Sequence, residues 1–172
     1  MLAHFMGLGK TLQAIALIHT VLTNQKLTKV KTVLILSPVN VMTNWMNELE
    51  NWTRDCQGGK LSVMIVSSKT RDQNMNTLKK WHATGGVLLI NYEMFKGSVR
   101  DKVESKQYLL DPGADLIVFD EGNKLKSKKI YKILTAELRT PRRIALTGKV
   151  IKLFTINFAL IRLEYHLSDL YL

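Results

Sequence analysis

A short glycine-rich segment near the amino terminus has the residue types that bind phosphate. Met6-Gly7-Leu8-Gly9-Lys10-Thr11 is followed directly by apolar residues at helical spacing. The glycines let the backbone fold around an anion, so that N–H groups of the turn and of the helix N-terminus point at phosphates. In such loops the lysine neutralises the β- and γ-phosphates, and the threonine hydroxyl binds Mg²⁺. The segment is predicted to bind a nucleotide, against the alternative of a simple glycine turn; the full pattern has glycine where this chain has His4.

Two acidic residues, Asp120 and Glu121, end the apolar run that begins at Leu116. A nucleotide site needs one acid at the tip of a neighbouring strand to hold the water shell of magnesium, and a second to orient and deprotonate the attacking water. Asp120 fits the first role and Glu121 the second; the alternative is a polar strand end before a turn. We therefore expect ATP and Mg²⁺ as cofactors, Lys10 and Glu121 as catalytic residues, and Thr11 and Asp120 as metal ligands.

Other catalytic chemistry finds little support in the sequence. A single cysteine, Cys56, excludes an internal disulfide and any zinc cluster built from cysteines. Neither a Ser/His/Asp arrangement nor a Gly-x-Ser-x-Gly motif is present, so acyl transfer is not supported. The four histidines show no metal-ligand spacing: they are His4, His19, His82 and His166.

Apolar runs alternate with segments of helical spacing along the chain. Most runs are apolar throughout, which is typical of strands covered on both faces. The expected strands are Val33–Ser37, Leu61–Val66, Val87–Asn91, Leu116–Asp120 and Ile144–Thr147. The expected helices are Leu12–Leu22, Val41–Trp52, Asp72–Thr84 and Ile130–Leu138. This alternation predicts an α/β fold with a mostly parallel sheet of about five to six strands and helices on both faces. The polar stretch Lys96–Leu110 is expected to be a loop or a frayed insertion.

The chain is strongly basic, with a formal net charge of +11 over 172 residues and a pI near 9.8. Between Lys124 and Lys152 the only acidic residue is Glu137. Such a bias favours contact with nucleic-acid phosphates, while a solvated surface remains the alternative. The candidate DNA contacts are Lys124, Lys126, Arg142 and Arg143. A secretory signal is not visible, and the apolar stretch Leu153–Ile161 is too short to span a bilayer, so we expect an intracellular protein with no membrane partner.

Taken together, these blocks resemble the first RecA-like lobe of the SNF2-type helicase-like ATPases, and most closely the ATRX and androgen-receptor-interacting-protein branch. They run in the family's order from about residue 2 to 148. His4 stands where that branch also departs from glycine. The matching segments are Met6–Gln13 for motif I, Ser37–Asn40 with Asn44–Trp52 for motif Ia and its helix, Gly85–Met94 for the next block, Asp120–Asn123 for motif II, and Leu146–Gly148 for the start of motif III. The resemblance implies an ATP site, a DNA-tracking surface and a nuclear location.

The sequence also departs from the family pattern. Asn123 replaces the histidine of motif II, and the chain leaves motif III at Lys149. We expect residues 1–150 to form a RecA-like lobe truncated at its N-terminal edge, and residues 151–172 to form a divergent helical tail. The second lobe, which in the family supplies the arginine finger, is not part of the sequence.

These features leave three classes of function. The first is the ATP-binding lobe of a DNA-dependent chromatin-remodelling ATPase in the nucleus, weak or inactive in hydrolysis by itself. The second is a non-catalytic fragment that binds double-stranded DNA, chromatin, a second RecA-like lobe or a partner remodeller, and competes with the intact enzyme. The third, a small P-loop kinase, would need an arginine-bearing lid and an acceptor pocket, and the sequence shows neither.

Overall fold

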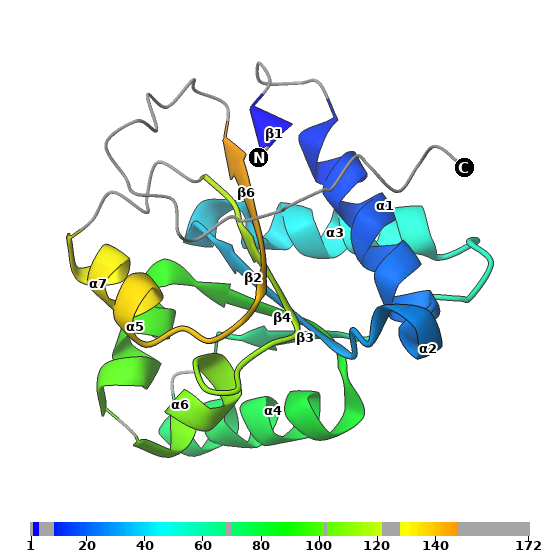
Figure 1. Ribbon diagram of the computed structural model, residues 1–172. Helices are drawn as coiled ribbons and strands as arrows, with labels where there is room; N and C mark the ends of the chain where they lie inside the picture. The colour runs from blue at the N-terminus through cyan, green and yellow to red at the C-terminus, as the bar shows by residue number, and fades with distance from the viewer. Residues whose placement is uncertain (1, 4–8, 68–69, 102, 122–127, 148–172) are drawn as a thin grey trace, which may run out of the picture.

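A parallel β-sheet forms the centre of the molecule. The computed structural model describes residues 2–3, 9–67, 70–101, 103–121 and 128–147. Within this part the sheet has six strands in the order β1-β6-β5-β2-β4-β3, and every neighbouring pair is parallel (Figure 1). The strands are β1 (Leu2–Ala3), β2 (Thr32–Ser37), β3 (Val63–Val66), β4 (Gly86–Asn91), β5 (Leu116–Phe119) and β6 (Arg142–Thr147). The predicted α/β fold with a parallel sheet is confirmed.

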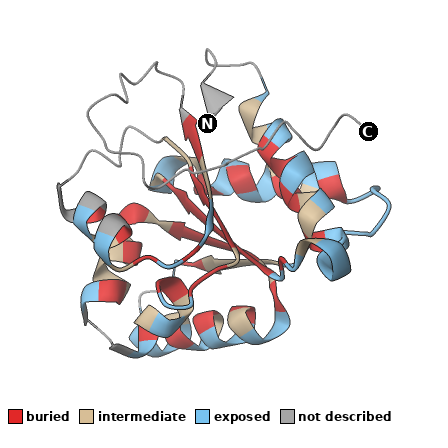
Figure 2. Cartoon of the chain, in the orientation of Figure 1, coloured by how far each residue is buried: buried red, intermediate tan, exposed pale blue. Residues whose placement is uncertain are grey.

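Helices cover both faces of this sheet. They are α1 (Lys10–Thr23), α2 (Gln25–Thr28), the short 3₁₀ helix η1 (Val39–Val41), α3 (Met42–Thr53), α4 (Arg71–Thr84), α5 (Tyr92–Asp101), α6 (Val103–Leu109) and α7 (Lys128–Ala136). One core cluster joins α1 and α3 to one face of the sheet, and a second joins α4, α5, α6 and α7 to the other. Figure 2 shows the consequence, with buried residues along the strands and exposed residues on the outer sides of the helices.

The central strands are apolar throughout because both of their faces are covered. All six residues of β2 and all four of β5 are buried. Neighbouring residues of β2 point to opposite faces, so Leu34 and Leu36 belong to the core under α4 to α7, while Val33 and Ile35 belong to the core under α1 and α3. Continuous apolar runs therefore identified these strands correctly.

The expectation of a loop over Lys96–Leu110 is wrong, because α5 and α6 occupy most of this stretch. The apolar stripe of α5 consists of Tyr92, Phe95 and Val99, spaced by three and four residues, and all three side chains are buried. This stripe begins before the polar stretch, so its helical period does not appear within Lys96–Leu110 itself.

Gly86, the first residue of β4, permits a close approach between strands. Gly86 has a φ of 95°, and a Cβ built on it would lie 2.5 Å from the carbonyl oxygen of Ser62. A side chain at this position would therefore both strain the backbone and collide with the segment that leads into β3. The glycine at this position therefore has a packing role.

Candidate nucleotide-binding site

The phosphate-loop helix and the acid pair lie at the same edge of the sheet. In the register of the strands, Leu2 of β1 pairs with Leu146 of β6, and Phe119 of β5 pairs with Ala145. Asp120, the next residue after Phe119, is therefore level with Leu146 and Leu2 at the carboxyl edge. Because β1 is parallel to β6 and β5, the chain leaves β1 at this same edge before α1 begins. Ligands of open α/β sheets bind at the carboxyl ends of the strands.

Gly9 begins α1 in a conformation that favours glycine. Its φ and ψ are 69° and 23°, in the left-handed region, and its carbonyl oxygen accepts the first helical hydrogen bond from the N–H of Gln13 at 2.9 Å. A Cβ on Gly9 would meet no described atom within 4 Å, so open space lies beside the turn. The N-cap residue is Gly9, which has no side chain to cap the helix N-terminus, and the first turn has no acidic residue. The N–H groups and the positive end of the helix dipole at this place suit an anion.

Lys10 and Thr11 occupy the first turn of α1, and both are half-buried. Lys10 has an interaction within the chain. Met6, Gly7 and Leu8, the other residues predicted to bind the nucleotide, lie outside the described residues, as does His4.

The carboxylate of Asp120 is held by donors from two other elements. Its Oδ2 accepts a hydrogen bond from the indole Nε1 of Trp45 at 2.8 Å and another from the hydroxyl of Ser37 at 3.1 Å. Its Oδ1 accepts the N–H of Glu121 at 2.9 Å. Trp45 lies on α3 and Ser37 ends β2, and both are buried. A carboxylate has about four acceptor positions, so these three bonds leave one on Oδ1 for a further donor such as a metal-bound water.

The main chain at Asp120 is fixed in the same way. Its N–H donates to the carbonyl oxygen of Leu36 at 2.8 Å, and its own carbonyl oxygen accepts the hydroxyl of Tyr92 at 2.6 Å. Burial raises the pKa of the Tyr92 hydroxyl well above its usual range, and the nearby negative charges of Asp120 and Glu121 raise it further. Tyr92 therefore remains a hydrogen-bond donor over the whole physiological range of pH.

Glu121 has a φ of 53°, in the left-handed region that a residue with a side chain rarely adopts. Such conformations cost on the order of 1–3 kcal/mol and cluster at functional sites. Glu121 is half-buried and directly follows Asp120.

Ser37, Trp45 and Tyr92 were not predicted as site residues, although each lies in a segment that resembles a family motif. The signal that could have identified Trp45 is its place on the apolar stripe of α3, because a buried indole N–H needs an acceptor. The local sequence around Ser37 and Tyr92 does not indicate that either residue forms a hydrogen bond with Asp120.

The candidate DNA contacts fall into two groups. Lys124 and Lys126 lie outside the described residues. Arg142 and Arg143 begin β6, at the amino edge of the sheet, opposite the edge that holds Asp120. The exposed Arg142 donates from Nη2 to the carbonyl oxygen of Thr28 at 3.3 Å.

Arg143 has contacts of a structural kind. Its Nε donates to the carbonyl oxygen of Thr140 at 2.7 Å, and its Nη2 donates to that of Leu138 at 2.8 Å. Burial lowers the pKa of its guanidinium. These bonds tie the start of β6 to the segment that follows α7.

The described part of the chain bears on metal binding and on membrane insertion. It contains no group of three or more His, Cys, Asp and Glu side chains placed to hold a metal ion. A magnesium ion bound through nucleotide phosphates and one or two protein oxygens needs no such group. Within the same residues, no helix has the length and apolar character needed to cross a bilayer. The expected helical tail, 151–172, lies outside the described residues, as do Gly122, Asn123 and Gly148.

Comparison with solved structures identifies the fold. The helicase domain of Hef from Pyrococcus furiosus superimposes with a TM-score of 0.59 over 86% of this chain and 29% of that chain, at 21% sequence identity. This likeness confirms the RecA-like architecture.

Comparison of sequences identifies the family. The family model described as SNF2-related domain matches residues 1–152. The chain is 40% identical over 159 residues to the Transcriptional regulator ATRX homolog of Drosophila melanogaster and to the Transcriptional regulator ATRX of Homo sapiens, covering 86% of this chain but 12% and 6% of those proteins. It is 28% identical to Helicase ARIP4 of Homo sapiens over 193 residues, covering 86% of this chain and 13% of that protein. The chain thus belongs to the SNF2-related domain family and is an SNF2-type ATPase lobe related to that of ATRX.

Proposed function

We propose that this chain binds Mg-ATP at the carboxyl edge of its sheet and acts as the ATP-binding lobe of a DNA-dependent chromatin-remodelling ATPase in the nucleus. The observation that carries the proposal is the position of the N-terminus of α1, with Lys10 and Thr11, at the edge of the sheet where the Asp120 carboxylate accepts hydrogen bonds from Trp45, Ser37 and the N–H of Glu121.

Each described residue of the proposed site would have its own role. The N–H groups at the start of α1 and the Lys10 ammonium would bind the phosphates. The Thr11 hydroxyl and the remaining acceptor position of Asp120 would hold the magnesium ion, which neutralises charge that develops on the phosphates. Glu121 would orient the attacking water and accept its proton. Met6, Gly7 and Leu8 would complete the loop around the phosphates.

Hydrolysis by the 172-residue chain alone is expected to be slow. An arginine finger contributes about 10³ to 10⁵ in rate to phosphoryl transfer, and in the family a second lobe supplies it. The partners proposed for the lobe are therefore double-stranded DNA or chromatin together with a second RecA-like lobe. Lys124, Lys126, Arg142 and Arg143 remain the proposed DNA contacts.

A second candidate function is a non-catalytic module that binds DNA or a partner remodeller and competes with the intact enzyme. The observation that favours it is the formal net charge of +11, which suits contact with nucleic-acid phosphates. The chain spans 6–13% of the length of the relatives above. In this case DNA binding would be retained without any effect of nucleotide.

One calorimetric experiment separates the two functions. Mg-ATP is titrated into the wild-type chain and into Lys10→Ala, each with and without a short DNA duplex. Saturable binding that Lys10→Ala loses supports the nucleotide-binding lobe, and DNA binding without nucleotide binding supports the competing module. Lys26→Ala is the control, because Lys26 is an exposed lysine on α2, away from the carboxyl edge. If both variants lose ATP equally, the binding reflects net charge and the proposed site is wrong.

A further inference from the structure

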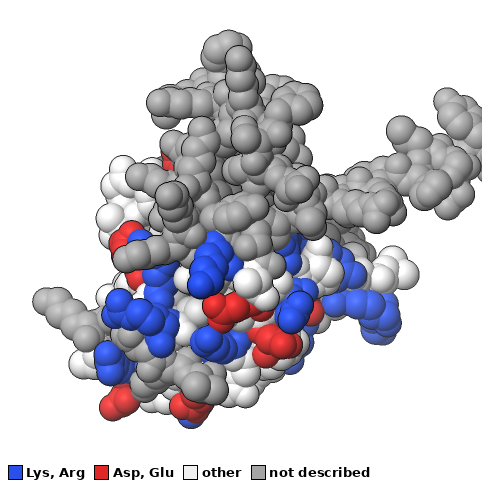
Figure 3. All heavy atoms as spheres, turned by 60° about the vertical axis from the view of Figure 1, so that its left-hand side comes forward, with Lys and Arg blue, Asp and Glu red and all other residues white. Residues whose placement is uncertain are grey.

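A groove separate from the nucleotide site lies between α5, α6 and α7. Its volume is about 620 Å³, which falls within the roughly 300–1,000 Å³ of sites that enclose small ligands or anchor side chains. All three helices cover the face of the sheet opposite α1 and α3. Figure 3 views the molecule from this side and shows Lys and Arg side chains spread over it, with carboxylates among them.

The groove combines an apolar floor with a charged rim. The floor includes Val99, which is buried, and Ile133, which is partly buried and packs against the core. Among the lining residues that the structure describes, four are positive and two are negative. The positive residues are Lys96, Arg100, Lys106 and Lys132, and the negative ones are Glu93 and Glu137.

Ion pairs hold two of the cations in position. Lys96 lies 2.6 Å from Glu93, and Lys106 lies 2.8 Å from Glu137. Both lysine side chains retain some exposure, 23% and 40% respectively. Arg100 and Lys132 also have interactions within the chain. Even with both carboxylates paired, the described lining keeps an excess of positive charge.

We propose that this groove binds an acidic peptide segment that carries at least one apolar side chain. The carboxylates of such a segment would meet Arg100 and Lys132 on the rim, and its apolar side chain would cover Ile133 on the floor. Charge complementarity fixes the orientation and the partner, while the buried apolar contact supplies the larger part of the affinity. The proposal concerns a protein partner and is independent of ATP binding.

Duplex DNA fits the same surface less well. Its phosphates present one negative charge per about 1.7 Å of helix axis. The rim also carries the carboxylates of Glu93 and Glu137, and a continuous row of phosphates would meet both of them, whereas a short peptide can place its carboxylates beside the cations alone. DNA also offers no apolar side chain for the floor between Val99 and Ile133.

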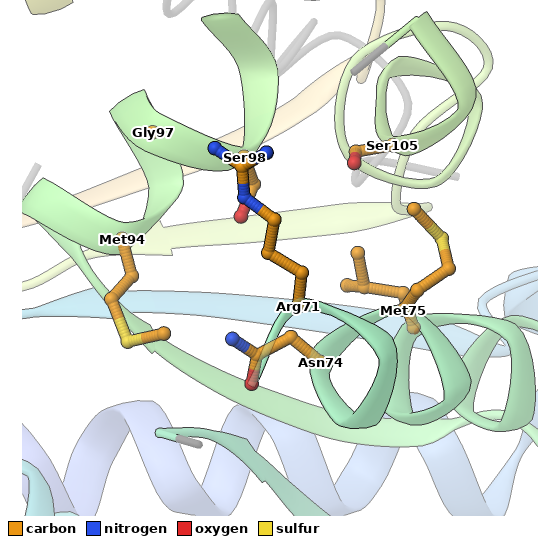
Figure 4. Close-up of a pocket in the computed structure, with 8 residues that line it drawn as sticks. Arg71, Asn74, Met75, Met94, Gly97, Ser98 and Ser105 are labelled. Carbon is orange, nitrogen blue, oxygen red and sulfur yellow. The ribbon is translucent and has the colours of Figure 1, made fainter. Parts of the chain in front are cut away.

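The other side of α5 has a cavity of a different kind. It has a volume of about 180 Å³ and lies between α4, α5 and α6, with Met75 and Met94 among its walls (Figure 4). Arg71 is the one cation of its described lining. Its small size and single charge do not suit a chain segment, so we place the peptide in the larger groove.

The test uses fluorescence anisotropy with the whole chain. One labelled probe is a peptide of aspartates and glutamates with two leucines, and a second has serines in place of the leucines. The groove variant is Arg100→Gln with Lys132→Gln. The matched control is Lys26→Gln with Lys60→Gln, which removes two positive charges from the lining of a different cavity. Lys60 forms an ion pair with Glu50 at 2.6 Å, so this control also disturbs an existing interaction.

We expect the leucine peptide to bind more tightly than the serine peptide, and its Kd to rise by about tenfold in the groove variant and little in the control. Equal losses in both variants, or no preference for leucine, would overturn the proposal. A third outcome would also overturn it: the wild-type chain binds duplex DNA but neither peptide, and the groove variant loses the DNA binding. That result would assign the groove to DNA. Circular dichroism checks the fold, and Lys132→Gln alone, at an exposed position of α7, serves if the double variant does not fold.

Discussion

The hydroxyl of Tyr92 donates a hydrogen bond of 2.6 Å to the main-chain carbonyl of Asp120. Tyr92 begins α5 and Asp120 follows β5, so this bond joins the first turn of a helix to the acid that we propose to hold magnesium. The position of Asp120 therefore depends in part on Tyr92, a residue outside the predicted nucleotide site.

The first prediction concerns Tyr92→Phe, which removes this hydroxyl and keeps the ring. The bond is partly buried, and we expect its loss to lower the free energy of unfolding at neutral pH by about 1 kcal/mol. Because the pKa of Tyr92 is raised in the folded state, its contribution is complete below the unfolded pKa of about 10 and declines as pH rises above it. Urea unfolding should show that the free energies of unfolding of the wild type and Tyr92→Phe differ at pH 7 and approach each other above pH 10. A difference that does not change with pH would contradict a hydrogen bond donated by the Tyr92 hydroxyl.

The second prediction compares two tryptophans on α3. Trp45 is buried and donates to Asp120 at 2.8 Å, whereas Trp52 is 50% exposed and donates to Glu48 at 2.6 Å. Trp45→Phe removes a donor from a half-buried carboxylate, so we expect a loss of about 1 kcal/mol in stability and weaker Mg-ATP binding. Trp52→Phe removes a similar bond at the surface and should change each quantity little. Equal effects on ATP affinity would show that the Trp45 bond does not position Asp120.

The third prediction compares two glycines, Gly9 and Gly97, at which an added Cβ would meet no described atom within 4 Å. Gly9 has a φ of 69°, whereas Gly97 lies within α5 without a positive φ. Gly9→Ala should cost about 1 kcal/mol in stability and reduce ATP affinity more strongly, because its methyl group would enter the space proposed for phosphate. Gly97→Ala should stabilise the chain by about 0.5–1 kcal/mol and leave ATP affinity unchanged. Thermal unfolding and calorimetry measure both, and unchanged ATP affinity in Gly9→Ala would contradict the phosphate-loop assignment.

The contrast between Gly9 and Trp45 shows what the sequence could predict. The glycine turn, the helix after it and the acid pair are local patterns. The helix was predicted as Leu12–Leu22 and is observed as Lys10–Thr23, and the acid pair follows β5 as predicted, while Met6, Gly7 and Leu8 lie outside the described residues. The partners of Asp120 come from elements far away in the chain, since Ser37, Trp45 and Tyr92 precede it by 83, 75 and 28 residues. Only the parallel packing of the strands brings them together, and a single sequence does not contain that register.

The same reasoning applies to the fold. Strands buried on both faces are continuous apolar runs, so β2, β4 and β5 were predicted to within a residue of their ends. The helices α5 and α6 bury only one stripe each and expose many charges, so the stretch looked like a loop. The polar residues of this stretch gave no helical pattern, because these helices are stabilised by packing against the rest of the protein.

The fourth prediction concerns Asp115, at the amino end of β5. Its Oδ2 accepts hydrogen bonds from the N–H of Lys31 at 2.8 Å, from the N–H of Thr32 at 2.9 Å and from the Thr32 hydroxyl at 3.0 Å. Asp115→Ala should lower the free energy of unfolding by about 1–3 kcal/mol, because three donors between β2 and β5 lose one acceptor. Asp55→Ala, at an exposed position after α3, is the control. Urea unfolding measures this loss of stability. If Asp115→Ala loses no more stability than Asp55→Ala, the hydrogen bonds to Asp115 contribute little to the folded state.

The last prediction separates the two arginines proposed to contact DNA. Arg143 is half-buried and donates to the carbonyls of Leu138 and Thr140, whereas Arg142 is exposed. Arg143→Gln should therefore lower stability by about 1–3 kcal/mol whether or not DNA is bound. Arg142→Gln should leave stability nearly unchanged and, if the side chain contacts a phosphate, reduce the dependence of log K on log salt by about one unit. Measuring duplex affinity over a range of salt for each single variant avoids the loss of folded protein that a double substitution would bring. An unchanged salt slope for Arg142→Gln removes this end of β6 from the DNA interface.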